Sequence, residues 1–250
     1  MSEFAAGPAG RIERVRALMA ERGYDAIVVR DEANLRWLTG VKGVFDYTFE
    51  FPHAAFITAD QCLFHTDSRY LNSFEENTPA GSPWVYDMDE GTIPGWVAGK
   101  IAANKCRVCA VEDDMQINFY QGIQRGLEDR SVACILPLMH DDIRKMRAIK
   151  DAEEIELMRH AQSITDAAFQ HMLGFIKPGM TEKQVRNELE NFMFANGADS
   201  LAFGSIVASG PNTANPHAVP SDRVIEKGDF VLMDLSLIHI SEPTRLALIS

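Results

Sequence analysis

The sequence has little of several features that would place it in a specialised class. It holds four cysteines in 250 residues, too few for the disulfide framework of a small secreted protein. No apolar run reaches the ~18 residues of a membrane span, because Asp234 interrupts the run Phe230–Ile240. The first ten residues contain no basic segment followed by an apolar one, so they do not resemble a secretory signal. We therefore expect a cytoplasmic protein.

Positive charge is also scarce. Lysine and arginine number 24 against 36 acidic residues, which gives a net charge of −12. Nucleic acids and anionic membranes require a basic surface, so we expect neither as a partner. Hydrophobic residues make up 46% and charged residues 24% of the chain, as in ordinary globular proteins. At roughly 150 residues per domain, the length predicts one large domain or two modest ones.

The first part of the chain alternates between strand and helix patterns, which is typical of an α/β domain. Residues 1–10 are small and are expected to fray. The antiparallel hairpin is predicted around the turn Ala59–Gln61. Strands are expected at 25–30, 53–58, 62–66, 107–112 and 133–136, and helices at 11–22, 33–38 and 116–127. We assign residues 1–140 to this domain.

The pattern changes from residue 141 onward. Asp151 with Glu154, and Thr181 with Gln184, have the spacing of capping boxes, and each precedes an amphipathic helical stripe. From Leu201 the residues favour strands separated by a turn-rich segment. Residues 141–236 therefore form a second region, in which paired helices precede β structure.

Two clusters carry weak signals for chemistry. Cys106 and Cys109 form a CxxC pair within a strand-like run, where this spacing places the two thiols on opposite faces; buried thiols are the favoured interpretation. His65 and Asp67 share a strand face, with His53 across the hairpin, which could be a metal cluster. Surface polar residues are the more common explanation for such a group. No phosphate-binding glycine loop is present.

His217 and Asp234 form a more specific pair. His217 lies in an irregular segment between two strands, where turns can direct a side chain into a cleft. Asp234 follows the apolar run Phe230–Met233, and burial of a carboxylate there is costly without a partner or a cation. A surface histidine and a strand-end cap explain the two residues equally well. Position and spacing alone leave both interpretations open.

The residues around this pair resemble a known family. Residues 206–236 (IVASGPNTANPHAVPSDRVIEKGDFVLMDLS) are similar to the first β segment of the pita-bread metallopeptidases, which include aminopeptidase P, prolidase, methionine aminopeptidase and creatinase. Residues 147–197 resemble the paired helices that open that domain. Residues 34–40 (NLRWLTG) and 66–70 (TDSRY) resemble the creatinase-type N-terminal domain. The order of both halves indicates the Xaa-Pro branch. The resemblance implies an α/β N-terminal domain followed by the first half of an α+β pita-bread domain.

The resemblance also implies a chemistry. Two divalent ions (Mn²⁺, Zn²⁺ or Co²⁺) lie between two aspartates, one histidine and two glutamates in that family, and Asp234 matches the first aspartate. His217 matches a histidine that contacts the substrate, where an imidazole can shuttle a proton. The implied activity is a metal-dependent Xaa-Pro peptidase acting on proline-containing peptides. Homodimers are common in the family.

The sequence departs from the family near its end. The second aspartate is expected eleven residues after Asp234, where this chain has Arg245. His239 and Glu242 are not at ligand spacing. Residues 237–250 resemble sequencing-adaptor read-through rather than the family. With one of five ligands present, we expect this chain to be an inactive truncation. Two alternatives are a creatinase-like, metal-free C–N hydrolase that relies on His217, and a non-catalytic peptide-binding module.

Overall fold

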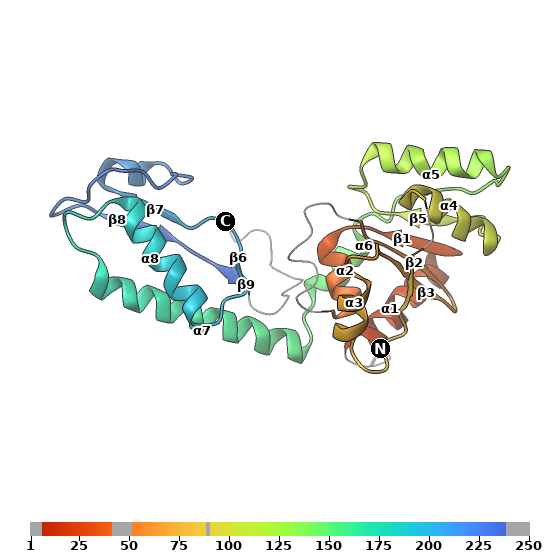
Figure 1. Cartoon of the computed structure of the whole chain (residues 1–250), viewed down its shortest axis with the longest axis horizontal. Helices are drawn as coiled ribbons and strands as arrows, with labels where there is room; N and C mark the ends of the chain where they lie inside the picture. The colour runs from red at the N-terminus through yellow and green to blue at the C-terminus, as the bar shows by residue number, and fades with distance from the viewer. Residues whose placement is uncertain (1–6, 42–51, 89–90, 239–250) are drawn as a thin grey trace. The chain divides into compact units, whose positions relative to one another are not determined.

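The computed structural model describes residues 7–41, 52–88 and 91–238 (Figure 1). These residues divide into two compact units, the first ending at Lys150 and the second beginning at Asp151. The division falls after Lys150 rather than after residue 140, because α6 (Asp142–Ala148) packs on the first unit and buries Ile143 in its core. None of the described helices is long and apolar enough to cross a membrane.

The first unit is built on a five-stranded mixed sheet in the order β4-β3-β2-β1-β5. The predicted hairpin is confirmed, since β2 pairs antiparallel with β3 in a register that sets Phe56 opposite Leu63. β1 is antiparallel to β2 and parallel to β5. The strand bounds are β1 Ala26–Val29, β2 Ala54–Thr58, β3 Cys62–His65, β4 Val85–Asp87 and β5 Cys109–Val111.

Helices cover both faces of this sheet, which confirms the α/β class (Figure 1). Because strand side chains alternate, Ile27 and Val29 pack with one helical layer while Ala26 and Val28 pack with the other. The first layer holds α1 (Gly7–Arg22), α2 (Glu32–Thr39), α3 (Leu71–Asn77) and α6; the second holds α4 (Ile93–Ala103) and α5 (Ile117–Asp129).

Three sequence expectations need correction in the first unit. Residues 133–136 form an isolated bridge at Ile135 rather than a strand, and a second bridge follows at Leu138; Pro137 between them has no N–H with which to continue the ladder. Helix α1 begins at Gly7, so residues 7–10 do not fray; Pro8 suits a first helical turn. Elements α3, β4 and α4 were not predicted. Helix α4 escapes a periodicity test because it is apolar on most sides.

The second unit opens with two helices, as predicted. Helix α7 (Ala152–Phe175) begins at a capping box formed by Asp151 and Glu154, and α8 (Glu182–Ala195) begins at one formed by Thr181 and Gln184. In each box the side chain of the cap accepts a backbone hydrogen bond, and the third helical residue accepts the backbone N–H of the cap. Both capping predictions are confirmed.

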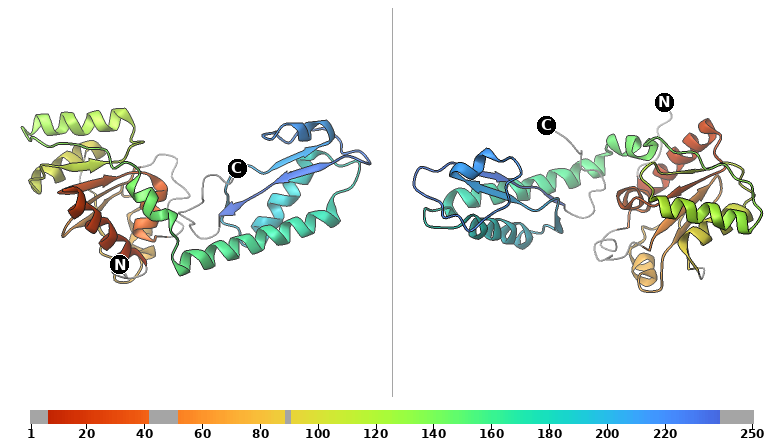
Figure 2. Two further views of the ribbon diagram at one scale, coloured as in Figure 1. Left: turned by 180° about the vertical axis from the view of Figure 1, so that it is seen from behind. Right: turned by 90° about the horizontal axis from the view of Figure 1, so that it is seen from above.

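Two strand pairs complete the described part of the second unit (Figure 2). β7 (Ile206–Ser209) is antiparallel to β8 (Val231–Asp234), and β6 (Ser200–Leu201) pairs with β9 (Leu237–Ile238). Their apolar residues share one core with α7 and α8. Residues 237 and 238, expected as part of a foreign tail, thus pair with β6. The rest of that segment, including His239, Glu242 and Arg245, lies outside the described residues.

Candidate functional site

Asp234 is the last residue of β8 and lies opposite Ile206 of β7. Its side chain is exposed, unlike the partly buried residues before it in the strand. The burial cost considered from the sequence therefore does not arise. Within the described ranges, the side chain of Asp234 makes no hydrogen bond or ion pair, so its carboxylate is available to a ligand. A carboxylate in this state suits a hard or borderline divalent cation.

His217 lies in the connection between β7 and β8. The chain leaves Ser209, forms the 3-10 turn Gly210–Ala214 and then reaches His217, which is exposed. The backbone N–H of His217 donates to Asn215 Oδ1 at 3.1 Å, and this bond closes a local turn. The structure gives no hydrogen bond between His217 and Asp234, although both belong to the β7–β8 unit. An exposed imidazole on a fixed turn can exchange a hydrogen bond with a bound peptide.

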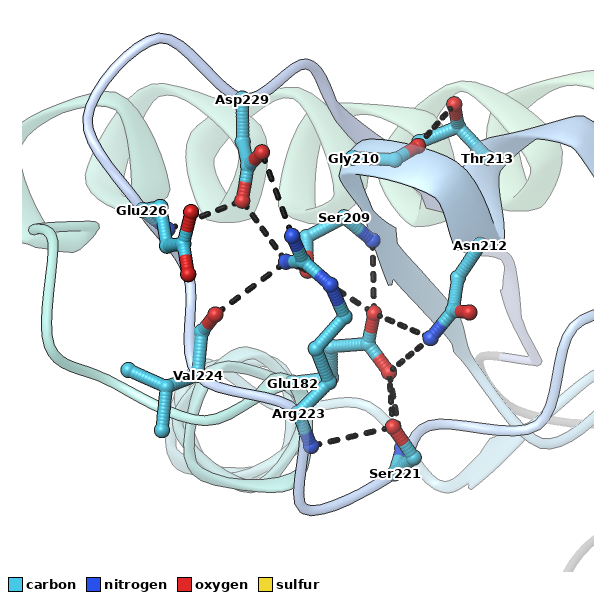
Figure 3. Close-up of polar contacts among 10 residues, drawn as sticks. All are labelled: Glu182, Ser209, Gly210, Asn212, Thr213, Ser221, Arg223, Val224, Glu226 and Asp229. Atoms are coloured by element: carbon cyan, nitrogen blue, oxygen red, sulfur yellow. Dashed lines mark hydrogen bonds and ion pairs between the residues drawn. The ribbon is translucent and has the colours of Figure 1, made fainter.

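A buried glutamate fixes both ends of this connection (Figure 3). Glu182 is the first residue of α8, and it is fully buried. Its Oε1 accepts the backbone N–H and the hydroxyl of Ser209 at 2.7 and 2.9 Å. Its Oε2 accepts the backbone N–H and the hydroxyl of Ser221 at 3.0 and 2.6 Å. Asn212 Nδ2 donates to both oxygens, at 3.0 and 3.2 Å. We call residues 209–221 the His217 loop.

These donors determine the charge of Glu182. Burial raises the pKa of its carboxyl, but the hydrogen bonds from Ser221, Asn212 and Ser209 outweigh it and lower the pKa to about 2. Glu182 is therefore ionised at neutral pH. Every partner donates to a carboxylate, which is the arrangement that stabilises the charged form most strongly.

A second group of polar contacts, made by Arg223 and Asp229, holds the segment that leads from the His217 loop to β8 (Figure 3). Arg223 donates from Nη1 to Ser209 Oγ at 2.7 Å and to Asp229 Oδ2 at 2.7 Å. Asp229 also accepts the backbone N–H of Glu226 at 2.8 Å. Gly210 has a φ of +49°, and a Cβ there would lie 2.6 Å from Arg223 Nη2 and from Asp229 Oδ1. Glycine is thus required where the His217 loop passes this ion pair.

The weaker candidates do not form a site. His53 and His65 are buried, and burial lowers the pKa of His53 to about 4, so it is neutral at physiological pH. Asp67 is bound by Arg69 through Nη2 at 2.7 Å. Cys106 and Cys109 are buried free thiols, and burial raises the pKa of both. Across the described part of the chain, no group of three or more His, Cys, Asp or Glu residues could hold a metal ion.

A cavity of about 290 Å³ in the first unit was not predicted from the sequence. It lies where β1 and β5 end, and Glu112, which is 5% exposed, contributes to its lining. Glu112 accepts the backbone N–H groups of Arg30 and Asp31 at 2.5 and 2.7 Å and Asn34 Nδ2 at 2.7 Å. Burial nevertheless raises the pKa of Glu112 to about 7. The other acidic lining residues are Asp31, Asp113, Asp114, Asp141 and Asp142.

Glu182 was also missed by the sequence reasoning. Its position in the first turn of a capped helix predicts a favourable interaction with the helix dipole and nothing more. Its partners Ser209 and Ser221 lie 27 and 39 residues further along the chain. No spacing within one helix or one strand connects them, so only the tertiary structure shows the cluster.

Comparison with known proteins covers both units. The profile of the creatinase/prolidase N-terminal domain matches residues 11–149, and that of metallopeptidase family M24 matches residues 156–241. A peptidase of Bacillus subtilis, YqhT, is 32% identical over 231 residues, which are 90% of this chain and 60% of that protein.

Solved structures give the same result. The chain resembles an Xaa-Pro dipeptidase from Bacillus anthracis with a TM-score of 0.79 and 32% identity, covering 92% of this chain and 61% of the other. It resembles an X-Pro aminopeptidase from Thermotoga maritima with a TM-score of 0.76 and 28% identity, covering 91% and 61%. The chain thus spans about 60% of the length of these relatives. Its first unit is a mixed α/β domain, and its second unit is part of an M24 domain.

Proposed function

Because the chain belongs to the creatinase/prolidase family, we propose that it is part of a metal-dependent Xaa-Pro peptidase, of the aminopeptidase P or prolidase type, that hydrolyses the bond before proline. The main support is that Asp234 and the loop bearing His217 are both exposed on one β7–β8 unit, inside the M24 match. The names of the structural relatives supply the substrate class.

We assign Asp234 as one metal ligand. A pair of divalent ions (Mn²⁺, Zn²⁺ or Co²⁺) would supply the Lewis acidity that polarises a peptide carbonyl and activates water. The described residues offer one exposed carboxylate at this place and no cluster of ligands, so by themselves they do not fit a pair of ions. The other donors belong, in this proposal, to the part of the family domain that the described residues do not include.

We assign His217 to the substrate. An imidazole on an exposed turn can hydrogen-bond the amide next to the scissile bond and hold or release a proton there. The Glu182 and Arg223 contacts fix the two ends of the loop before any substrate binds, and such preorganisation favours catalysis.

A chimera tests the proposal. Residues 1–236 are joined to the part of the Bacillus anthracis dipeptidase that the match does not span. The chimera should hydrolyse Ala-Pro and leave Ala-Ala intact. Asp234→Asn should abolish hydrolysis together with bound metal, and His217→Ala should lower kcat by about 10²–10⁴-fold, the range of acid–base catalysis. Asp222→Asn, at an exposed acid in the same region, is the matched control.

Two results would contradict the proposal. One is full hydrolysis by the Asp234→Asn chimera, and the other is equal cleavage of Ala-Pro and Ala-Ala. The 250-residue chain alone should cleave neither peptide and should retain no stoichiometric Mn²⁺ after gel filtration, because its described residues hold one candidate ligand. Retention of equimolar Mn²⁺ would show that the ligand assignment is wrong.

A further inference from the structure

Glu182 contacts the two ends of the His217 loop with different oxygens. Oε1 binds Ser209, the last residue of β7, and Oε2 binds Ser221, where the loop ends. Asn212 joins the two oxygens through one amide group. One side chain of α8 therefore joins two loop ends that are 12 residues apart in sequence.

Besides Glu182, the loop ends are held by Arg223, which donates to Ser209 Oγ at 2.7 Å, and by the backbone bonds Gly210 N–H to Phe230 O at 2.9 Å and Lys183 N–H to Ser221 O at 3.2 Å. The part of the loop around His217 is held less firmly. Asn215, Pro216 and His217 are all exposed, and Ala218 and Pro220 are the buried residues that follow. The bonds within the loop are local, such as the backbone N–H of Ala218 to the carbonyl of Asn215 at 3.2 Å. A segment with few buried apolar contacts keeps one conformation only if its polar anchors persist.

The anchoring requires an ionised carboxylate. Each oxygen accepts a hydrogen bond from a backbone N–H and from a hydroxyl. A proton on either oxygen, or an amide NH₂ in its place, would therefore point at a backbone N–H, which can only donate. A glutamine would keep one loop end and release the other. An aspartate is one methylene shorter and would not reach both serines.

We propose that Glu182 is a positioning residue for His217, acting as an ionic clamp that gives the His217 loop a single conformation. This inference rests on the proposed role of His217, because positioning matters only if that side chain meets substrate. The clamp itself is a property of the described residues, so it is tested without any peptidase activity.

Hydrogen–deuterium exchange of the 250-residue chain at pH 7 measures the clamp. Glu182→Gln should speed exchange of amides in residues 210–221 at least tenfold more than exchange of amides in β8 and in the last two turns of α8, which follow the stability of the whole unit. Glu188→Gln is the matched control, because Glu188 lies on the same helix and contacts His171 at 2.7 Å instead of the loop. It should leave residues 210–221 unchanged.

A histidine spectrum separates positioning from general stability. The chain has seven histidines, and the Cε1–H signal of His217 is identified by its loss in His217→Ala. In Glu182→Gln the His217 signal alone should shift or broaden. If Glu182→Gln fails to fold, Ser221→Ala takes its place, since it removes the 2.6 Å hydroxyl donor and leaves the carboxylate ionised.

Two outcomes would overturn the proposal. In the first, residues 210–221 exchange at the wild-type rate in the folded variant. In the second, exchange rises equally throughout the second unit and all histidine signals move, which is the signature of a residue that only stabilises the fold. Loss of hydrolysis in the chimera, by contrast, tests the peptidase assignment and leaves these two measurements intact.

Discussion

Each of the two units contains a buried glutamate, and the two carboxyls are driven in opposite directions. Glu112 of the first unit is 5% exposed and Glu182 of the second is 0% exposed. The pKa of Glu112 is raised to about 7, whereas that of Glu182 is lowered to about 2. Similar side-chain exposure thus accompanies one carboxyl with a raised pKa and one with a lowered pKa.

The difference lies in the donors. Glu112 accepts three N–H groups, and the negative charge of Asp31 nearby also disfavours its ionisation, so burial dominates. Glu182 accepts two backbone N–H groups, two hydroxyls and a side-chain amide. Glu112 also lies deeper inside the protein than Glu182, so its ionised form loses more solvation. The depth of burial and the number of donors together therefore decide which glutamate carries a fixed charge.

Exchanging each glutamate for glutamine should give the largest contrast. Glu182→Gln should lower the free energy of unfolding of the second unit by about 2–4 kcal/mol, because buried donors lose a charged acceptor. Glu112→Gln should cost less, about 1–2 kcal/mol in the first unit, because the amide oxygen can keep both backbone N–H groups and the amide NH₂ faces one donor, Asn34 Nδ2. Denaturant unfolding with a probe in each unit measures both values. Equal losses of unfolding free energy in the two units would contradict the difference proposed between the two glutamates.

The next largest loss of stability is expected at Gly210, where the His217 loop passes the Arg223–Asp229 pair. Gly210→Ala should cost about 1–3 kcal/mol, because a non-glycine residue at a φ of +49° is strained and its Cβ would meet the Arg223–Asp229 pair. Gly204→Ala is the control: its φ lies outside the left-handed region and its Cβ would meet nothing within 4 Å. Thermal unfolding of both variants measures the difference. A Gly210→Ala variant as stable as the control would show that the ties at this crossing are weak.

The two glutamates should make the free energy of unfolding depend on pH with opposite signs. Each slope is at most about 1.4 kcal/mol per pH unit, because one proton is involved. The usual pKa of 4.5 for Glu182 falls to about 2 in the fold, so its stabilisation is present above pH 4.5 and is lost as the pH falls toward 2. Glu112 rises from 4.5 to about 7, so stability is greatest below pH 4.5 and falls as the pH increases through 7. In each glutamine variant the free energy of unfolding should no longer change with pH over the range in which the replaced glutamate titrates. Persistence of either slope in that variant would contradict the assignment.

His217→Ala should have the smallest effect on stability. The side chain is exposed and its only described hydrogen bond involves the backbone, so the change should stay within about 0.5 kcal/mol. The same substitution should strongly reduce kcat in the chimera. A large loss of stability would indicate that His217 is a structural residue instead.

The sequence predicted those elements that local rules determine. The hairpin of β2 and β3, the stop of α2 at Gly40 and the capping boxes of α7 and α8 follow from turn and cap chemistry within a few residues. The positions of His217 and Asp234 in the loop and at the strand end were also predicted.

The remaining features depend on contacts between distant segments. Helix α4 lies close to α5 because Gly126 leaves room for Ala98, where an added Cβ would come within 2.8 Å. The cavity beside Glu112 needs the ends of β1 and β5 together. The Glu182 cluster joins a helix start to two serines far along the chain. The residue pattern within a single helix or strand does not predict these contacts between distant segments.

The most direct measurement is a pH titration of the glutamate carboxyl carbons by ¹³C NMR, with Glu112→Gln and Glu182→Gln used for assignment. If deep burial controls the charge of Glu112 and hydrogen-bond donors control that of Glu182, the first carboxyl titrates near pH 7 and the second remains ionised below pH 3. Titration of both carboxyls close to pH 4.5, or of Glu182 above that value, would contradict the ionic clamp on the His217 loop.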